Sequence, residues 1–320
     1  MVAAGERPRV ALIAGPTASG KSGLAVALAK ALEAAGEKAV IINADASQVY
    51  ADLTVLSARP TVPEMAGVPH RLFGHVDGAE DYNAARWAGE AKAEIAAAHT
   101  SGAVSILVGG TGLYLRTLLN GIAPVPEIEA DIRARVRSLA VADAYGELQQ
   151  TDPVAAARLK PADTTRVSRA LEVVLSSGIP IGEWQTRTQG GIADAIALTP
   201  FILLPPRAWL IERSDRRFVE MIESGGAEAE VRALLARKLN ENLPVMRAIG
   251  VPEVAAMLRG EISQADAIAA GQLATRQYAK RQYTWFRNQP PADWARNEES
   301  LNSSNISQLA ILLRDGVLTR

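Results

Sequence analysis

The chain has 320 residues and a formal net charge of −1, so no global positive field indicates a nucleic-acid partner, and any such partner must meet a local patch. It has no cysteine, which excludes disulfides, thiolate zinc sites and a cysteine nucleophile. The segment from Met1 to Arg9 lacks the apolar core of a signal peptide, and no apolar run reaches membrane-spanning length. We therefore expect a cytoplasmic protein with no membrane partner. A monomer is expected as well.

A predicted buried strand, Val10 to Ala14, leads into a loop with the spacing G-x-x-x-x-G-K-[ST]. The loop consists of Gly15, Pro16, Thr17, Ala18, Ser19, Gly20, Lys21 and Ser22. Its amides can face inward, and the helix predicted over Leu24 to Leu32 adds a positive dipole end, so the loop can bind phosphoryl oxygens. Lys21 would neutralise phosphate charge and Ser22 would ligate Mg²⁺. The phosphates of a nucleoside triphosphate and of an allylic diphosphate fit equally well.

A second predicted strand, Ala39 to Asn43, is followed by Asp45. Ligands of open α/β sheets lie beyond the carboxyl ends of the strands, so Asp45 would emerge beside the phosphate loop. The alternative is an Asp that caps the next helix or turn. The Pro- and Gly-rich segment 51–81 is predicted to be irregular and to lie over a site. Its two histidines, His70 and His75, show no metal-ligand pattern.

After a predicted helix, Tyr82 to Ala98, a third strand is predicted from Val104 to Val108. The glycine turn that follows, Gly109 to Gly112, points toward the same end of the sheet. Thr111 would present its hydroxyl there among residues of little bulk, although a turn-forming Thr is the alternative.

Residues 123–198 are predicted to form an all-helical insertion into a core made of residues 1–122 and 199–320. The helices are expected over Ile128 to Leu139, Ala142 to Gln149, Pro153 to Leu159 and Thr164 to Ser176. Arginines such as Arg133, Arg166 and Arg169 could follow a phosphate backbone, or they could be ordinary surface residues.

The chain returns to the sheet with a predicted strand, Phe201 to Leu204, followed by a helix from Arg207 to Glu223. Arg213 and Arg217 lie four residues apart and therefore on one face of that helix. They could clamp an anion, or they could pair with the neighbouring acids Glu212, Asp215 and Glu220.

The last informative stretch, Thr275 to Arg287, interleaves basic and aromatic residues with no acid between them. The rings are those of Tyr278, Tyr283, Trp285 and Phe286. Cations for phosphates beside rings for stacking suit single-stranded or looped RNA. The alternative is an amphipathic helix with its rings in the core.

Together these motifs resemble the bacterial tRNA dimethylallyltransferase family, also called IPP transferases. The resemblance runs from Val10 to about Arg287, and the order and spacing of its motifs are highly specific. The motifs are Gly-Pro-Thr-Ala-Ser-Gly-Lys-Ser at 15–22, Asp-x-x-Gln-Val-Tyr at 45–50, Val-Gly-Gly-Thr-Gly-Leu-Tyr-Leu at 108–115, Arg-Ala-Leu-Glu-Val at 169–173 and Thr-Arg-Gln-Tyr-Ala-Lys-Arg-Gln at 275–282. The fold expected is an α/β P-loop NTPase-like parallel sheet flanked by helices, with an inserted all-helical domain.

The resemblance implies transfer of a dimethylallyl group from dimethylallyl diphosphate to N6 of adenosine 37 in tRNA. The loop from Gly15 to Ser22 would hold the diphosphate, with Mg²⁺ at Ser22, and Arg213 and Arg217 would stabilise the leaving group. Asp45 would be the base for the amine proton, with Thr111 close to the reacting groups. The residues implied to meet tRNA are Asp45, Ala46, Ser47, Gln48, Thr111, Arg133, Thr165, Arg166, Arg169, Arg247, Gly250, Thr275, Arg276, Gln277, Lys280, Arg281 and Gln282. The helical insertion would grip the anticodon stem-loop.

The chain departs from the family pattern in two places. It has Asp45-Ala46-Ser47-Gln48 where the family usually has Asp-Ser-x-Gln, which removes or shifts one hydroxyl. It has Val251-Pro252 where the family usually has Tyr-Lys, which removes a cation. The zinc finger of eukaryotic relatives cannot form without cysteine.

Three other functions remain open at this level. A small-molecule or nucleotide kinase would share the phosphate loop, with Asp45 as its Mg²⁺ carboxylate because the third strand ends without an acid. Adenylate isopentenyltransferase would use the same donor with a different acceptor, and the basic aromatic stretch argues against it. A nucleotide-dependent RNA-binding switch would release no diphosphate from dimethylallyl diphosphate.

Overall fold

The computed structural model describes residues 7–319. Within this range the chain forms two compact units. The first is made of the chain up to Arg116 and from Ala193 onward, and the second is Thr117–Ile192. The sequence predicted a helical insertion over residues 123–198, and the second unit of the structure is Thr117–Ile192. No helix among the described residues is both long and apolar enough to cross a membrane.

The first unit contains a six-stranded sheet in the order β3-β2-β4-β1-β5-β6, in which every neighbouring pair is parallel. Its strands are β1 (Arg9–Ala14), β2 (Lys38–Asn43), β3 (His70–Arg71), β4 (Ala103–Gly109), β5 (Ala197–Leu203) and β6 (Ala295–Asn297). The predicted α/β fold with a parallel sheet is therefore confirmed. The two edge strands were not predicted, because two and three residues are too short to carry an alternating pattern.

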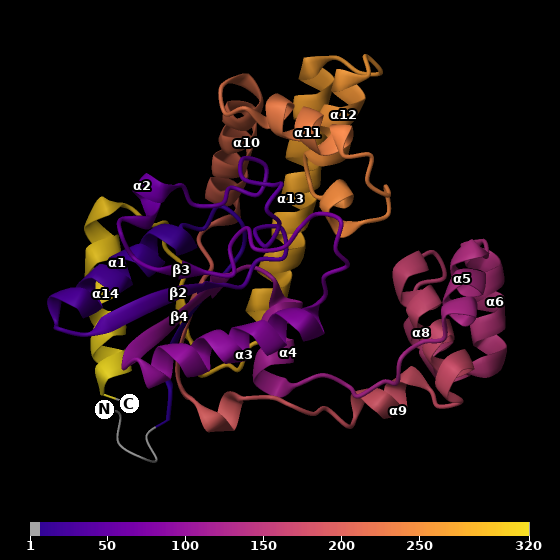
Figure 1. The fold of residues 1–320 in the computed structure, drawn as a ribbon, viewed down its shortest axis with the longest axis horizontal. Coiled ribbons are helices and arrows are strands. Elements are labelled where there is room, and N and C mark those ends of the chain that lie inside the picture. The colour runs from indigo at the N-terminus through magenta and orange to yellow at the C-terminus, as the bar shows by residue number, and fades with distance from the viewer. Residues whose placement is uncertain (1–6, 320) are drawn as a thin grey trace. The chain divides into compact units, whose positions relative to one another are not determined.

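Helices cover both faces of this sheet (Figure 1). α1 (Lys21–Ala34) and α14 (Ser303–Leu318) pack on one face, where Ala11 and Ile13 of β1 join their apolar cluster. Val10 and Leu12 alternate with these residues and are equally buried. Because both faces are covered, β1 reads as one continuous apolar run, which is why it could be recognised in the sequence.

The opposite face is covered by α3 (Ala84–Thr100) and closed by α4 (Gly112–Asn120). Trp87 of α3 is fully buried, and its indole N–H donates to the carbonyl of Asn43 at 2.8 Å. Its ring stacks on Tyr114 of α4 with the ring centres 4.6 Å apart. Trp87 is thus a core residue that fixes the carboxyl end of β2, just before Asp45.

A group of helices follows β5 and carries the second half of the site. It comprises α10 (Arg207–Glu223), α11 (Ala227–Ala236), α12 (Val251–Leu258) and α13 (Gln264–Asn288), and α10 and α12 both pack on α13. α13 begins where the Ser263 hydroxyl accepts a hydrogen bond from the amide of Asp266, as an N-cap residue does. The predicted basic aromatic stretch is the second half of this helix. α11, α12 and the short α2 (Val62–Met65) were not predicted.

The second unit is all-helical and has its own apolar core. It contains α5 (Ala130–Ser138), α6 (Val141–Thr151), α7 (Pro153–Arg158), α8 (Thr164–Ser177) and α9 (Ile181–Gln185). Val136, Leu148, Val167 and Leu171 are fully buried in one cluster. The two ends of the helical segment meet in an antiparallel bridge, in which Ile122 and Gln189 exchange two backbone hydrogen bonds of 3.0 Å.

Candidate active site

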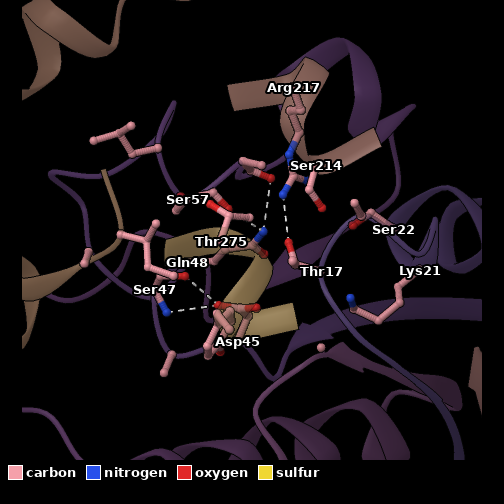
Figure 2. Close-up of a pocket in the computed structure, with 18 of the residues that line it drawn as sticks. Thr17, Lys21, Ser22, Asp45, Ser47, Gln48, Ser57, Ser214, Arg217 and Thr275 are labelled. Atoms are coloured by element: carbon pink, nitrogen blue, oxygen red, sulfur yellow. Dashed lines mark hydrogen bonds between the residues drawn. The ribbon is translucent and has the colours of Figure 1, made fainter. Parts of the chain in front are cut away.

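One cavity of about 790 Å³ lies within the first unit, at the carboxyl ends of β1, β2 and β4. Its wall is formed by the phosphate loop, the segments that begin at Asp45 and Leu56, and the helices α10 and α13 (Figure 2). This volume is typical of a small-molecule site. The cavity therefore lies at the end of the sheet where the sequence predicted the site.

The phosphate loop between β1 and α1 is shaped by close backbone packing. A Cβ atom on Gly15 would lie 2.4 Å from the carbonyl oxygen of Leu203, so only glycine fits there. Gly20, with φ of 92°, ends the loop in a left-handed conformation directly before α1. Most of the loop, including Thr17, Ala18, Lys21 and Ser22, lines the cavity.

Lys21 is the cation at the floor of the cavity, and its ammonium donates to the carbonyl of Pro16 at 2.7 Å. Desolvation by burial lowers the pKa of Lys21 to about 8, and the nearby charge of Arg217 adds to this, while the carboxylate of Asp45 opposes it. A lysine with a pKa this low is poised to gain charge when an anion binds.

Arg217 and Arg213 both line the cavity from α10. Arg217 donates to the hydroxyl of Thr17 in the phosphate loop at 2.7 Å. Burial and the neighbouring charge of Arg213 lower the pKa of Arg217. Neither arginine pairs with a carboxylate within residues 7–319, because Glu212 lies 3.9 Å from Arg216 and Asp215 binds Arg276 instead. The geometry thus supports an anion clamp rather than local ion pairs.

Asp45 lines the cavity directly after β2. Its Oδ1 accepts hydrogen bonds from the amide of Ser47 at 3.0 Å and from the hydroxyl of Ser47 at 2.7 Å. Both interpretations of the sequence therefore hold, since this carboxylate caps a turn and also faces the ligand space (Figure 2). The hydrogen bonds fix the side chain, as the orientation of a catalytic base requires.

Thr111 is not among the residues that line the cavity. Its hydroxyl accepts a hydrogen bond from the amide of Ala46 at 2.9 Å, and it also interacts with the hydroxyl of Tyr278. Thr111 thus positions the segment that carries Asp45, and its direct part in catalysis stays a prediction. Gly109 supports the same junction, because a Cβ atom there would lie 2.1 Å from the carbonyl oxygen of Ala44.

The segment 51–81 contributes a wall of the cavity through Leu56, Ser57, Ala58 and Pro60. The carboxylate of Glu230, on α11, accepts hydrogen bonds of 2.6 to 2.9 Å from the three successive amides of Thr54, Val55 and Leu56. The predicted location over the site is correct, but the segment is anchored. His70 and His75 make local contacts, and no cluster of three or more potential metal ligands occurs in the described part of the chain.

The residues implied to meet tRNA fall into four groups. Those on the cavity wall are Asp45, Ala46, Ser47, Gln48, Arg247, Thr275 and Arg281. Those exposed on α13 outside the cavity are Arg276, Gln277 and Lys280. Those in the helical unit are Arg133, Thr165, Arg166 and Arg169. Those that do not line the cavity and make internal contacts with residues of its wall are Thr111, Gly250 and Gln282.

Gly250 and Gln282 need a correction, because each is buried and performs an internal task. A Cβ atom on Gly250 would lie 2.5 Å from Leu56, so this glycine makes room for the cavity wall. The amide of Gln282 binds the phosphate loop and Gly110 rather than facing solvent. Because both residues are buried, neither is accessible for direct contact with RNA.

Sequence reasoning did not assign Ser214 to the site, and it considered Tyr278 only as a ring for RNA stacking; both line the cavity. The hydroxyl of Ser214 is buried and has no hydrogen-bond partner among the described residues, as is also true of Ser19 in the loop. Burial raises the pKa of Tyr278, whose ring lies on the cavity wall. Ser214 could have been found, since it precedes Arg217 by three residues and so shares its helix face.

Comparison with known proteins identifies relatives of this chain. A family model described as IPP transferase matches residues 48–289. The chain is 66% identical over 311 residues to the tRNA dimethylallyltransferase of Sphingopyxis alaskensis, covering 97% of this chain and all of that protein. It is 62% identical over 294 residues to that of Erythrobacter litoralis, covering 92% of each chain.

Solved structures show the same architecture. The tRNA isopentenylpyrophosphate transferase of Bacillus halodurans matches with a TM-score of 0.70 and 30% identity over 98% of each chain. A eukaryotic dimethylallyltransferase acting on tRNA matches with a TM-score of 0.73 and 30% identity, over 86% of this chain and 69% of that one. The resemblance drawn from the motifs is confirmed, and this chain is an enzyme that belongs to the IPP transferase family.

Proposed function

We propose that this enzyme transfers a dimethylallyl group from dimethylallyl diphosphate to N6 of adenosine 37 in tRNA, giving N6-isopentenyladenosine and diphosphate. The observation that carries the proposal is one cavity whose wall holds the cations Lys21, Arg213 and Arg217, suited to a diphosphate, together with the carboxylate of Asp45. Relatives that carry the name tRNA dimethylallyltransferase, at up to 66% identity over nearly the whole chain, support it.

The cations act on the donor. The bond between the allylic carbon and the diphosphate oxygen breaks, and negative charge grows on the diphosphate while the carbon becomes cationic. Lys21 and Arg217, both desolvated, stabilise that growing charge more strongly than solvated groups would. The buried hydroxyl of Ser214, on the cavity wall, lacks a partner among the described residues, and the diphosphate oxygens offer it an acceptor.

Asp45 acts on the acceptor. The lone pair of the adenine amine is delocalised into the ring, so N6 becomes a competent nucleophile only as its proton leaves. The new carbon–nitrogen bond forms while the carboxylate of Asp45 takes that proton. The hydrogen bonds from Ser47 hold the carboxylate in place for this task.

The residues present fit a magnesium ion. Ser22 opens α1, and its hydroxyl lies on the cavity wall in the same cavity as the carboxylate of Asp45. Mg²⁺ prefers oxygen ligands and is commonly held by one or two protein groups together with substrate phosphates, so a dedicated cluster of acids is not required. When bound, the ion would neutralise charge on the diphosphate, and Ser22 would hold it.

The acceptor base must leave its stack to enter the cavity, which is less costly from an anticodon loop than from a duplex. The exposed cations of α13, with Arg281 on the cavity wall, would meet the phosphates near that base. The arginines of α5 and α8 would grip the anticodon stem-loop. We place this reaction in the cytoplasm, with the enzyme acting as a monomer.

Incubation with labelled dimethylallyl diphosphate, Mg²⁺ and unmodified tRNA tests the proposal. Nucleoside analysis should find the label in N6-isopentenyladenosine, with diphosphate released in equal amount. Phosphoryl transfer from ATP without labelled nucleoside would overturn the proposal in favour of a kinase, and binding of both substrates without release of diphosphate would overturn it in favour of a switch.

A further inference from the structure

Gln282, in the C-terminal half of α13, connects two glycine-bordered turns of the site. Its Oε1 accepts a hydrogen bond from the backbone amide of Thr17 at 2.7 Å, and its Nε2 donates to the carbonyl of Gly110 at 2.8 Å. The side chain is 5% exposed. The hydroxyl of Tyr278, one helical turn earlier, also interacts with the side chain of Gln282. The Thr17 amide can only donate and the Gly110 carbonyl can only accept, so these two backbone contacts fix the orientation of the Gln282 amide.

These contacts determine how Thr17 takes part in the phosphate loop. Its amide N–H donates to Gln282 and its hydroxyl accepts from Arg217, so side chains from α13 and α10 hold it from two directions. Thr17 nevertheless lies on the cavity wall, in the middle of the segment that would surround a diphosphate. Thr17 is therefore held by residues that follow it by 200 and 265 positions in the sequence.

The structure also makes room for this contact. A Cβ atom on Gly110 would lie 2.3 Å from Nε2 of Gln282, so the turn after β4 requires glycine at the point where the amide docks. α13 carries Tyr278 on the cavity wall one helical turn earlier, and Arg281, also on the wall, immediately precedes Gln282. One rigid helix thus touches the phosphate loop and presents the cations proposed to meet RNA.

Resting on the proposed function, we propose that Gln282 is a positioning residue that holds the phosphate loop in its donor-binding shape and couples donor affinity to the occupancy of α13 by RNA. Because the Gln282 amide and the exposed cations belong to one helix, a displacement of α13 by bound RNA would be transmitted through Gln282 to Thr17. Coupling of this kind is reciprocal, so RNA and diphosphate must change one another's affinity by the same factor.

The first test compares Gln282→Met with Gln289→Met, a matched substitution at an exposed position just beyond α13. Loss of a hydrogen bond to a buried amide should raise the KM for dimethylallyl diphosphate by about 10-fold to 100-fold in Gln282→Met. The kcat at saturating donor should stay within about threefold, because the reacting groups are untouched. A KM equal to that of the wild type, or a fall in kcat alone, would overturn the positioning role.

The second test measures the binding of inorganic diphosphate with and without an unmodified anticodon stem-loop. The wild type and Gln289→Met should show a change in affinity on adding RNA, and Gln282→Met should lose it. An unchanged ratio in Gln282→Met would overturn the coupling. Because this readout needs no transfer, a wild type that couples the two ligands but makes no isopentenyladenosine would contradict the proposed function and leave this inference standing.

If Gln282→Met does not fold, Gln282→Glu decides the question. A protonated Glu can still accept from Thr17 and donate to Gly110, whereas an ionised one faces the Gly110 carbonyl without a proton and brings a negative charge toward the diphosphate. The diphosphate affinity of Gln282→Glu relative to the wild type should therefore recover as the pH falls. A ratio that does not depend on pH would contradict the proposal.

Discussion

Asp45 and Lys21 show how two residues of opposite charge can work in one cavity. Asp45 is held by Ser47 in a turn, while Lys21 is desolvated beside it. The carboxylate of Asp45 raises the pKa of Lys21, which burial lowers. Asp45, the proposed proton acceptor, and Lys21, the anion-binding residue, thus lie close together, and each is also held by a hydrogen bond to another group of the protein.

We expect Asp45→Asn to lower kcat by about 10²-fold to 10⁴-fold, the usual contribution of a general base. The amide is of similar size but cannot take the proton, so the Kd for tRNA should change little. Single-turnover transfer and filter binding would measure the two effects. Glu64→Gln is the matched control, because this carboxylate also lines the cavity but caps α2 through Thr61. Weakened tRNA binding with normal chemistry at saturating tRNA would contradict the role given to Asp45.

The lowered pKa of Lys21 leads us to expect that diphosphate binding depends on pH. Its free-state pKa of about 8 lies below the ordinary value, and a bound anion raises it, so the protonated form is the one that binds. The affinity for diphosphate should stay nearly constant up to about pH 8 and then fall by about tenfold for each further pH unit. Titration calorimetry across pH 7 to 9.5 would measure this. Lys21→Arg, always charged, should show the dependence of the diphosphate alone, and equal slopes in both proteins would argue against Lys21.

At the scale of elements, α13 serves as core, cavity wall and exposed cationic surface. Ala279 and Phe286 face the core, while Lys280 and Arg281 are exposed. The amphipathic interpretation of this basic aromatic stretch is therefore confirmed, and contact of its exposed cations with RNA stays a prediction. The 25-residue length of α13 lets it reach the phosphate loop as well.

Alanine substitution of Lys280 and Arg281 should weaken tRNA binding and make it less dependent on salt. Each lost phosphate contact should reduce the slope of log K against log salt by about 0.7 to 0.9. Lys38→Ala is the control, since Lys38 is exposed at the amino-terminal end of β2, away from the carboxyl-end cavity. The measurement is a salt titration of tRNA binding, and a slope like that of the wild type would mean that these cations do not contact phosphate.

At the scale of the whole molecule, two compact units divide the chain, each with its own core. The cavity belongs entirely to the first unit. The helical segment leaves and returns at the paired residues Ile122 and Gln189, so its ends already have the spacing of a β-hairpin. The donor site should therefore not depend on the helical unit.

Replacing residues 123–188 by an Asn-Gly turn should keep diphosphate affinity within about threefold and lower affinity for the anticodon stem-loop by at least about tenfold, since several cations that could meet phosphates are removed. Calorimetry with diphosphate and binding of a labelled stem-loop test the two halves. Retained RNA affinity in a folded variant would show that the helical unit does not grip the stem-loop. Lost diphosphate affinity would show that the two units are not independent.

The sequence by itself determined the four central strands, the phosphate loop, the position of Asp45 and the family. These are local features, since buried strands read as short apolar runs and the loop has a fixed spacing. The sequence could not decide whether Arg217 pairs with an acid or faces a ligand, because both a neighbouring acid and a ligand could be reached from the same helix face. The short strands β3 and β6 carried too few residues to show any pattern.

Only the tertiary structure decided that Gln282 supports the phosphate loop instead of meeting RNA, that Thr111 holds the Asp45 segment, and that Ser214 faces the cavity. Such roles depend on contacts between residues as far apart as 265 positions, which have no periodicity and no composition of their own. Spacing along the chain reports which side chains share a strand or a helix face, whereas packing between elements decides which of them meet.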